Sequence, residues 1–288
     1  MLVSLKEILQ IAEAKRIAIG AFNACNLESL EGNLAAAEAL GLPVILQFAQ
    51  SHEPWIRLKL LGPVMVAAAK EASVPVCVHL DHGVDLGYLR LALDLGFTGI
   101  MMDASTRPYE HNVQMSREAA ELAHRYGASC EAELGSMGAL ESGLGDGAED
   151  QTKVYTDPTL AKDFVAQTGV DALACSFGTT HGIYLKAPRL DFEVVRRVRE
   201  ATGNIPVVMH GGSGVSPEAF REAIAAGVRK INYFTYMDKA GGAAAKTAIE
   251  RMDRAGAPVF FSAISMEARR AMQENVMTAM RVFAGLPD

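Results

Sequence analysis

Three histidines and several carboxylates end or directly follow apolar runs along this chain. His82 comes directly after Asp81 at the end of the run 74–80, and His210 ends the run 205–210. Similar positions after other runs hold Asp103, Glu133 and His181. Neutral imidazoles together with carboxylates bind Zn²⁺, or another divalent ion of similar softness. The residue types therefore predict a metal site, provided that the fold brings these positions together.

Eight short apolar runs, each followed by a stretch with helical periodicity, recur along the sequence. Near-continuous apolar strands that alternate with amphipathic helices are typical of a parallel sheet covered by helices. Eight such units in about 250 residues favour a closed barrel over an open sheet, and no run is followed by the GxGxxG fingerprint of a dinucleotide-binding sheet. The runs span residues 17–22, 43–48, 74–80, 99–103, 128–133, 171–176, 205–210 and 228–234.

We therefore predict an α/β protein with a (β/α)₈ TIM barrel and extra C-terminal helices. A chain of 288 residues that is 50% apolar can bury one full core. We expect a single domain over residues 1–288, in which residues 236–288 form a helical extension. The active site of such a barrel lies at the carboxyl ends of its strands, so the polar residues there should converge.

Each polar residue also has a structural interpretation. A single histidine is more often a surface or hydrogen-bonded residue than a ligand, and we interpret His52, His111 and His124 in this way, while the role of His79 stays open. Asp103 could cap a turn. Glu133 could be a metal ligand, a partner that orients a ligating histidine, or half of a structural ion pair.

A glycine-rich turn, "HGGSG" at residues 210–214, offers a second kind of chemistry. Small residues leave backbone N–H groups accessible, and Ser216 and Pro217 are well suited to begin a helix just beyond them. A helix start of this kind binds anions, and the loops after strands seven and eight of (β/α)₈ enzymes often bind phosphate. Here these loops are residues 211–213 and 232–235.

Composition restricts the partners and the compartment. The formal net charge of −7 argues against a general nucleic-acid or anionic-membrane surface, because both require a basic field. No apolar run approaches the roughly 20 residues that span a bilayer. The cysteines are far apart and show no CxxC spacing, so we expect reduced, mostly buried thiols in a cytoplasmic protein; they are Cys25, Cys77, Cys130 and Cys175.

The motifs as a set resemble the class II ketose-bisphosphate aldolases, the metal-dependent fructose- and tagatose-bisphosphate aldolases. The resemblance extends from about Gly20 to Asn232. In order, the motifs are "HLDHG", "GFTGIMMDAS", "EAELGSMGALE", "YTDP", "TGVDALACSFGTTHG", "LDF", "VVMHGGSG" and "GVRKIN". This resemblance implies reversible aldol cleavage of a ketose phosphate or bisphosphate to a dihydroxyacetone-phosphate-type donor and an aldehyde, in a homodimer or homotetramer.

Roles for individual residues follow from the same resemblance. Zn²⁺, one per subunit, would be held by His82, His181 and His210. Asp81 would exchange the proton of the C4 hydroxyl, and Glu141 would be the acid/base of the loop after strand five. Substrate and phosphate contacts would fall on Asn23, Gly182, Lys186, Gly211, Gly212, Ser213, Asn232 and Thr235. A monovalent cation, Na⁺ or K⁺, would bind near Gly182 and Gly211.

Departures from the family pattern concern the substrate. Tyr233 and Phe234 stand where the family has smaller or polar residues that face phosphate, and Ala49 stands where it usually has Ser or Thr. Ser142 replaces an acid beside Glu141. We expect these changes to narrow the pocket or to change its ligand.

Two alternatives to a metal-dependent aldolase remain. Lys230 has the same strand parity as Asn232 and could point into the barrel, where a Schiff-base aldolase would carry its lysine. Such an enzyme has no use for three converging histidines. The other alternative is a non-catalytic barrel that binds a sugar phosphate, which the altered residues near Phe234 favour and the complete set of metal-ligand candidates opposes.

Overall fold

The computed structural model describes residues 1–135, 155–180, 182 and 188–287. Eight parallel strands form a closed barrel in chain order, and β8 pairs with β1 through Lys230 and Ile19. This confirms the predicted (β/α)₈ barrel, and every predicted apolar run overlaps one strand. The strands are β1 (Ile19–Asn23), β2 (Val44–Ala49), β3 (Val76–Gly83), β4 (Gly99–Met102), β5 (Ser129–Leu134), β6 (Ala172–Cys175), β7 (Val207–Met209) and β8 (Val228–Asn232).

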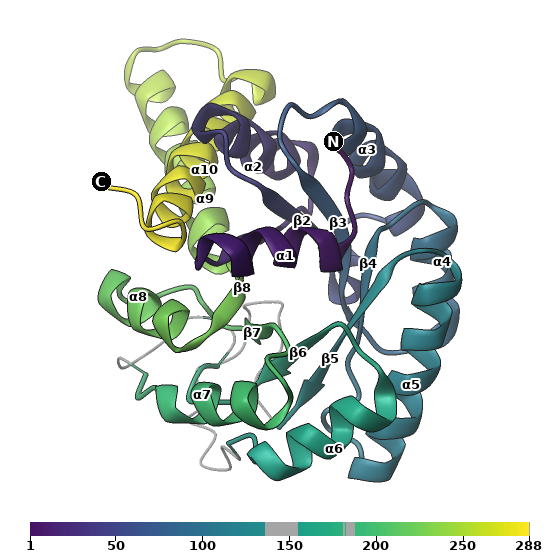
Figure 1. Ribbon diagram of the computed structural model, residues 1–288. Helices are drawn as coiled ribbons and strands as arrows, with labels where there is room; N and C mark the ends of the chain where they lie inside the picture. The colour runs from purple at the N-terminus through teal and green to yellow at the C-terminus, as the bar shows by residue number, and fades with distance from the viewer. Residues whose placement is uncertain (136–154, 181, 183–187, 288) are drawn as a thin grey trace.

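Helices surround the barrel (Figure 1). Local capping explains where several of them begin: the Ser216 side chain accepts a hydrogen bond at the start of α8, with Pro217 as the first helical residue, as the sequence predicts. The helical elements are α1 (Leu5–Lys15), α2 (Leu27–Leu40), the short 3₁₀ turn η1 (Gln50–His52), α3 (Leu58–Glu71), α4 (Leu86–Asp94), α5 (Tyr109–Arg125), α6 (Pro158–Thr168), α7 (Phe192–Ala201), α8 (Pro217–Ala226), α9 (Thr235–Arg254) and α10 (Phe261–Phe283).

The apolar core inside the barrel is confined to its amino-terminal end. There α1 lies across the barrel (Figure 1) and buries Leu5, Ile8 and Leu9 against Ile19 and Ile45. Toward the carboxyl ends of the strands, the inward-facing positions become polar and buried. They are Asn23, Gln47, His79, Asp81, Glu131, Glu133, His210, Lys230 and Asn232. The sequence therefore places its buried charges at one end of the barrel.

The helices that follow the barrel pack back onto it. α10 lies against α9 and α2 (Figure 1), and its Phe283 ring stacks on Phe22 of β1 at 6.5 Å between ring centroids. Tyr233 packs edge-on against the same two rings. The expectation that Tyr233 faces the phosphate is therefore wrong, because β8 ends at Asn232 and the next side chain points outward into the layer of helices.

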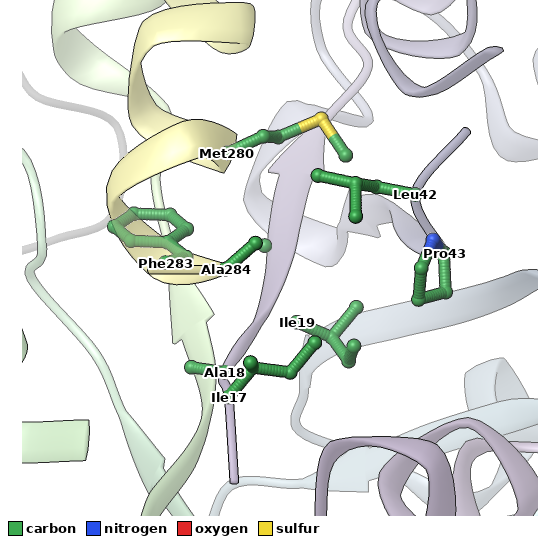
Figure 2. Close-up of a pocket in the computed structure, with 9 residues that line it drawn as sticks. Ile17, Ala18, Ile19, Leu42, Pro43, Met280, Phe283 and Ala284 are labelled. Carbon is green, nitrogen blue, oxygen red and sulfur yellow. The ribbon is translucent and has the colours of Figure 1, made fainter. Parts of the chain in front are cut away.

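An apolar pocket lies between the start of β1, the turn before β2 and the end of α10 (Figure 2). Its position at the amino-terminal end of the barrel separates it from the polar strand ends. It is lined by Ile17, Ala18, Ile19, Gly20, Leu42, Pro43, Met280, Phe283 and Ala284. Since this lining lacks polar side chains, we assign no chemistry to it.

Two further findings concern the chain as a whole. Among the described residues, no helix is long and apolar enough to cross a membrane.

All four cysteines are free thiols; Cys77, Cys130 and Cys175 are buried, whereas Cys25 is partly exposed. Burial raises the pKa of the Cys25 thiol to about 11, so even this thiol is a poor nucleophile at neutral pH.

Candidate active site and metal centre

An irregularity in β3 allows two consecutive residues to face the same site. The pairing of β3 with β4 shifts register between Leu80 and Gly83, and His82 adopts a left-handed backbone conformation with φ 46°. In a regular strand Asp81 and His82 would point to opposite faces. The bulge turns His82 toward the interior rim, so both side chains reach the polar end of the barrel.

Asp103 fixes the orientation of the His82 ring. The Nδ1 atom of His82 lies 2.7 Å from Oδ2 of Asp103, and Ser105 donates to the other carboxylate oxygen. Burial opposes ionisation of Asp103, but the interaction with His82 and the two hydrogen bonds from Ser105 together outweigh it and lower the pKa of the carboxyl. Because an ionised carboxylate only accepts, Nδ1 of His82 carries the hydrogen and Nε2 has the lone pair.

Glu131 fixes the orientation of the ring of His210, the residue that follows β7. Its Oε1 atom lies 2.8 Å from Nε2 of His210. Burial alone would raise the pKa of Glu131, but the nearby Lys230 charge together with the contacts of His210 and His79 holds it well below its ordinary value. Burial lowers the pKa of His210, which favours its neutral form. Nε2 of His210 therefore donates, and the lone pair of this ring lies on Nδ1.

The two lone pairs point at each other. Nδ1 of His210 lies 3.0 Å from Nε2 of His82, and two lone pairs at this distance repel unless a proton or a cation lies between them. Two groups of residues could each hold a metal ion, because their ligand atoms all lie within 4.8 Å of one another. One group is Asp81, His82 and His210, and the other is His82, Asp103 and Glu133. Imidazole nitrogens with carboxylate oxygens suit Zn²⁺, so the residues present fit the metal.

Asp81 is held at both carboxylate oxygens. Asn23 donates to Oδ2 at 3.0 Å, and Asn232 donates to Oδ1 at 3.1 Å; Gln47 in turn donates to Asn23 at 3.2 Å. Burial opposes its ionisation, but the positive charge that His82 carries when protonated, together with the charge of Lys230 and those of His210 and His79 when protonated, outweighs burial and lowers the pKa of Asp81. The group is therefore ionised at neutral pH, in one fixed orientation. Asn23 contacts this carboxylate, and its expected contact with substrate stays a prediction.

A layer of buried polar residues beneath the site was missed from the sequence. Glu131 contacts Lys230 at 2.9 Å and His79 at 3.4 Å, and all three side chains are fully enclosed. Strand parity could have found this layer, because Glu131 lies two residues before Glu133 on β5. Lys230 does point inward, as expected, but its ion pair and its enclosure argue against a Schiff-base role.

The two loops expected to bind phosphate, residues 211–213 and 232–235, lie against each other. Gly212 donates its backbone N–H to the Asn232 carbonyl at 3.1 Å. Gly211 has φ 64°, and a Cβ there would lie 2.3 Å from the Thr180 carbonyl oxygen, so only glycine fits. Ser213 Oγ lies near the backbone nitrogens of Phe234 and Tyr236 at the start of α9, next to Thr235.

Several expected residues cannot be placed in this way. Glu141, His181 and Lys186 lie outside the described residues, so their proposed roles stay predictions. Gly182 has a left-handed backbone with φ 92°, and its role in binding stays a prediction as well. The histidines interpreted as structural lie apart from the cluster: His111 and His124 are on the outer helix α5.

His52 instead forms part of an aromatic cluster at the rim. It stacks on Trp55 at 4.5 Å and packs against Phe234 at 5.0 Å between ring centroids. The loop after β2 and the residues after β8 thereby meet across the end of β1. Phe234 is 5% exposed and Trp55 is 47% exposed, so the cluster presents one indole face to solvent beside the predicted phosphate loops.

Comparison with known proteins decides the family. The family model described as class II fructose-bisphosphate aldolase matches residues 3–285. The chain belongs to this aldolase family. The chain is therefore a lyase, and the members of this aldolase family act on sugar phosphates. The resemblance seen in the sequence motifs is confirmed.

Individual relatives agree with this assignment. A fructose-bisphosphate aldolase of Geobacillus stearothermophilus is 40% identical over 238 residues, 81% of each chain. A probable fructose-bisphosphate aldolase of Bacillus subtilis is 35% identical over 285 residues, covering 98% of this chain and 97% of the relative. Among solved structures, the YdjI aldolase from Escherichia coli K12 has 33% identity and a TM-score of 0.85, with 98% and 97% of the two chains covered.

Proposed function

We propose that this protein is a Zn²⁺-dependent class II aldolase that reversibly cleaves a ketose phosphate or bisphosphate. The products would be a dihydroxyacetone-phosphate-type donor and an aldehyde. The observation that carries the proposal is the pair of imidazole lone pairs on His82 and His210, each fixed by a carboxylate on the opposite ring nitrogen. His181 would supply the third imidazole, and Asp103 and Glu133 would orient the ligands or bind the metal themselves.

Cleavage of the carbon–carbon bond requires removal of one proton and stabilisation of one developing charge. Asp81, ionised and held by two amides, would accept the proton of the C4 hydroxyl as the bond between C3 and C4 breaks. When bound, the metal ion supplies a Lewis acid for the negative charge that develops on the donor oxygens. Glu141 would return a proton to the donor carbon that loses its partner.

The phosphate of the donor would lie at the loops after β7 and β8. The glycine-only backbone at Gly211, the hydroxyl of Ser213 and the start of α9 near Thr235 support this assignment. Asn232 would help to orient the donor. Lys186 and Gly182 would complete the site, and a Na⁺ or K⁺ ion near Gly182 and Gly211 remains part of the proposal.

The chain would work as one domain in a cytoplasmic homodimer or homotetramer. The packing of α10 on α2 and of Phe283 on Phe22 supports a single domain, and free cysteines are typical of a reducing compartment. Phe260 and Phe261 are 62% and 79% exposed at the turn between α9 and α10, and a second copy of the chain would cover them. Light scattering of the purified protein measures the mass.

A panel of ketoses tests the reaction. The purified protein with Zn²⁺ is incubated with phosphorylated and free ketoses, and the release of triose phosphate and of aldehyde is followed separately. We expect cleavage of at least one ketose phosphate and of no free ketose. Saturable binding of ketose phosphates without any cleavage would contradict the proposal and favour the non-catalytic barrel.

A further inference from the structure

Lys230 contacts two residues of the site, one beside the metal ligand His210 and one beside the base Asp81. Its side chain is fully enclosed in the barrel. The Nζ atom lies 2.9 Å from Oε2 of Glu131 on β5 and donates to Oδ1 of Asn232 at 2.8 Å. The chemistry proposed above uses neither the charge nor the hydrogens of this lysine.

One branch leads to the metal ligand. Lys230 holds Oε2 of Glu131, and Oε1 of the same carboxylate accepts from Nε2 of His210. This ion pair occupies one oxygen of the Glu131 carboxylate and leaves the other oxygen facing Nε2 of His210, which donates to it. The lone pair on Nδ1 is thereby aimed at the metal position beside His82.

The other branch leads to the base. A side-chain amide can be turned either way, and the choice is set by its partners. Because Lys230 only donates, Oδ1 of Asn232 must face it, and the Nδ2 group is left to donate to Oδ1 of Asp81. One buried ammonium therefore fixes the orientation of the amide that positions the carboxylate base.

We propose that Lys230 is a positioning residue that aligns the metal ligand His210 and the base Asp81 at the same time. The inference rests on the proposed function for its catalytic half, whereas its metal-binding half stands on the contacts of Glu131 and His210 alone. It also gives this strand-end lysine a role that does not involve a Schiff base.

Two variants separate this role from a merely structural one. Lys230→Met removes the ammonium and leaves Glu131 as an unpaired buried carboxylate, which destabilises a fold strongly. The double variant Lys230→Met/Glu131→Gln removes both charges, and the oxygen of the new side-chain amide can still accept from His210. Lys246→Met, on the exposed face of α9, is the matched control.

The measurements are melting temperature, zinc affinity by competition with a chromophoric chelator, the visible spectrum of the Co²⁺-substituted protein, and kcat and KM. For Lys230→Met we expect zinc affinity to fall about 10- to 100-fold with an altered Co²⁺ spectrum. In the double variant we expect the melting temperature and zinc affinity to recover, whereas kcat stays at least about tenfold low, because Oδ1 of Asn232 loses the ammonium that orients this amide.

Recovery of kcat in the double variant would overturn the proposal, since stability alone would then explain the lysine. If folded Lys230→Met protein has the same zinc affinity and Co²⁺ spectrum as the Lys246→Met control, Lys230 does not align the metal ligand His210, and that part of the proposal is overturned. Zinc affinity and the Co²⁺ spectrum do not require turnover. They therefore still test the metal-binding role of Lys230 if the wild-type protein cleaves no ketose and the proposed function itself fails.

Discussion

Asp81 is a carboxylate whose two oxygens are both occupied by side-chain amides. Asn23 and Asn232 come from the neighbouring strands β1 and β8 and donate to different oxygens. Both contacts stabilise the ionised form, which is the form that accepts a hydroxyl proton. The residue is thus fixed in its protonation state and in its orientation before any substrate binds.

Replacing Asp81 with Asn tests the base. We expect kcat to fall by about 10²- to 10⁴-fold. The new amide must also place its NH₂ group against an Asn23 or Asn232 donor, so stability falls by about 1–3 kcal/mol. Steady-state kinetics, metal content and urea unfolding check these effects. Asp85→Asn is the control, because asparagine caps α4 as well as aspartate does; a kcat for Asp81→Asn within threefold of wild type would contradict the role.

Phe234 lies in the loop predicted to bind the donor phosphate, and its ring should limit the donor groups that are accepted there. Removing the ring in Phe234→Ala opens space beside His52 and Trp55, so the ratio of kcat/KM for a ketose bisphosphate over a ketose monophosphate should rise about tenfold. The ratio is measured in the cleavage direction with a series of ketose phosphates. Tyr233→Phe is the control, since Tyr233 packs against Phe22 and Phe283 away from the rim. An unchanged ratio in Phe234→Ala would refute the assignment.

At the scale of elements, the site depends on irregularities at the strand ends. The bulge in β3 lets Asp81 and His82 face the same interior, and a Cβ at Gly83 would lie 2.8 Å from the Met101 carbonyl oxygen. The sequence predicts strand and helix positions because these follow from periodicity and capping. It does not predict the bulge, which depends on how closely β3 and β4 approach each other.

The loop after β7 offers a matched pair of glycine substitutions. Gly211 and Gly41 have nearly the same φ, 64° and 63°, but a Cβ at Gly41 meets nothing within 4 Å. Both alanine variants should lose about 1–2 kcal/mol of stability from left-handed strain, and Gly211→Ala should lose more because its Cβ meets the Thr180 carbonyl oxygen. Only Gly211→Ala should displace the loop and raise KM for the sugar phosphate, by about tenfold or more. Equal KM values in the two variants would argue against a phosphate site at this loop.

At the scale of the whole molecule, the barrel buries charged and polar groups instead of a continuous apolar interior. His79 is enclosed within this polar layer, 3.4 Å from Glu131. Burial, with the charge of Lys230, lowers its pKa below the ordinary value of 6.5. The folded protein therefore favours a neutral imidazole, while the unfolded chain protonates this residue as pH falls below 6.5.

His79 should therefore make stability depend on pH. Its contribution is fully present above the unfolded pKa of 6.5 and is lost as pH falls toward the lower folded value. The free energy of unfolding should decrease by up to about 1.4 kcal/mol per pH unit below that point because of this one group. His79→Gln should flatten the curve by that amount in urea titrations from about pH 7 to 5. Parallel curves for the two proteins would exclude the effect.

The sequence alone predicts most of the fold but only part of the site. Strand-end residues such as Asp81, His82 and His210 could be found because a parallel barrel gathers its carboxyl strand ends at one rim. The pairing of Lys230 with Glu131 could not, since it joins β8 to β5 across the barrel and depends on closure and register. Tyr233 was placed wrongly because the end of β8, one residue earlier, decides which way it points.

Metal dependence is the central claim, and removal of the metal tests it most directly. Cleavage of a ketose phosphate is measured before chelation with EDTA, after chelation, and after titration with Zn²⁺, and a parallel sample is treated with borohydride. We expect activity to disappear on chelation and to return with about one Zn²⁺ per chain, with no reductive trapping. Activity that survives chelation and is trapped by borohydride on a lysine would contradict the claim.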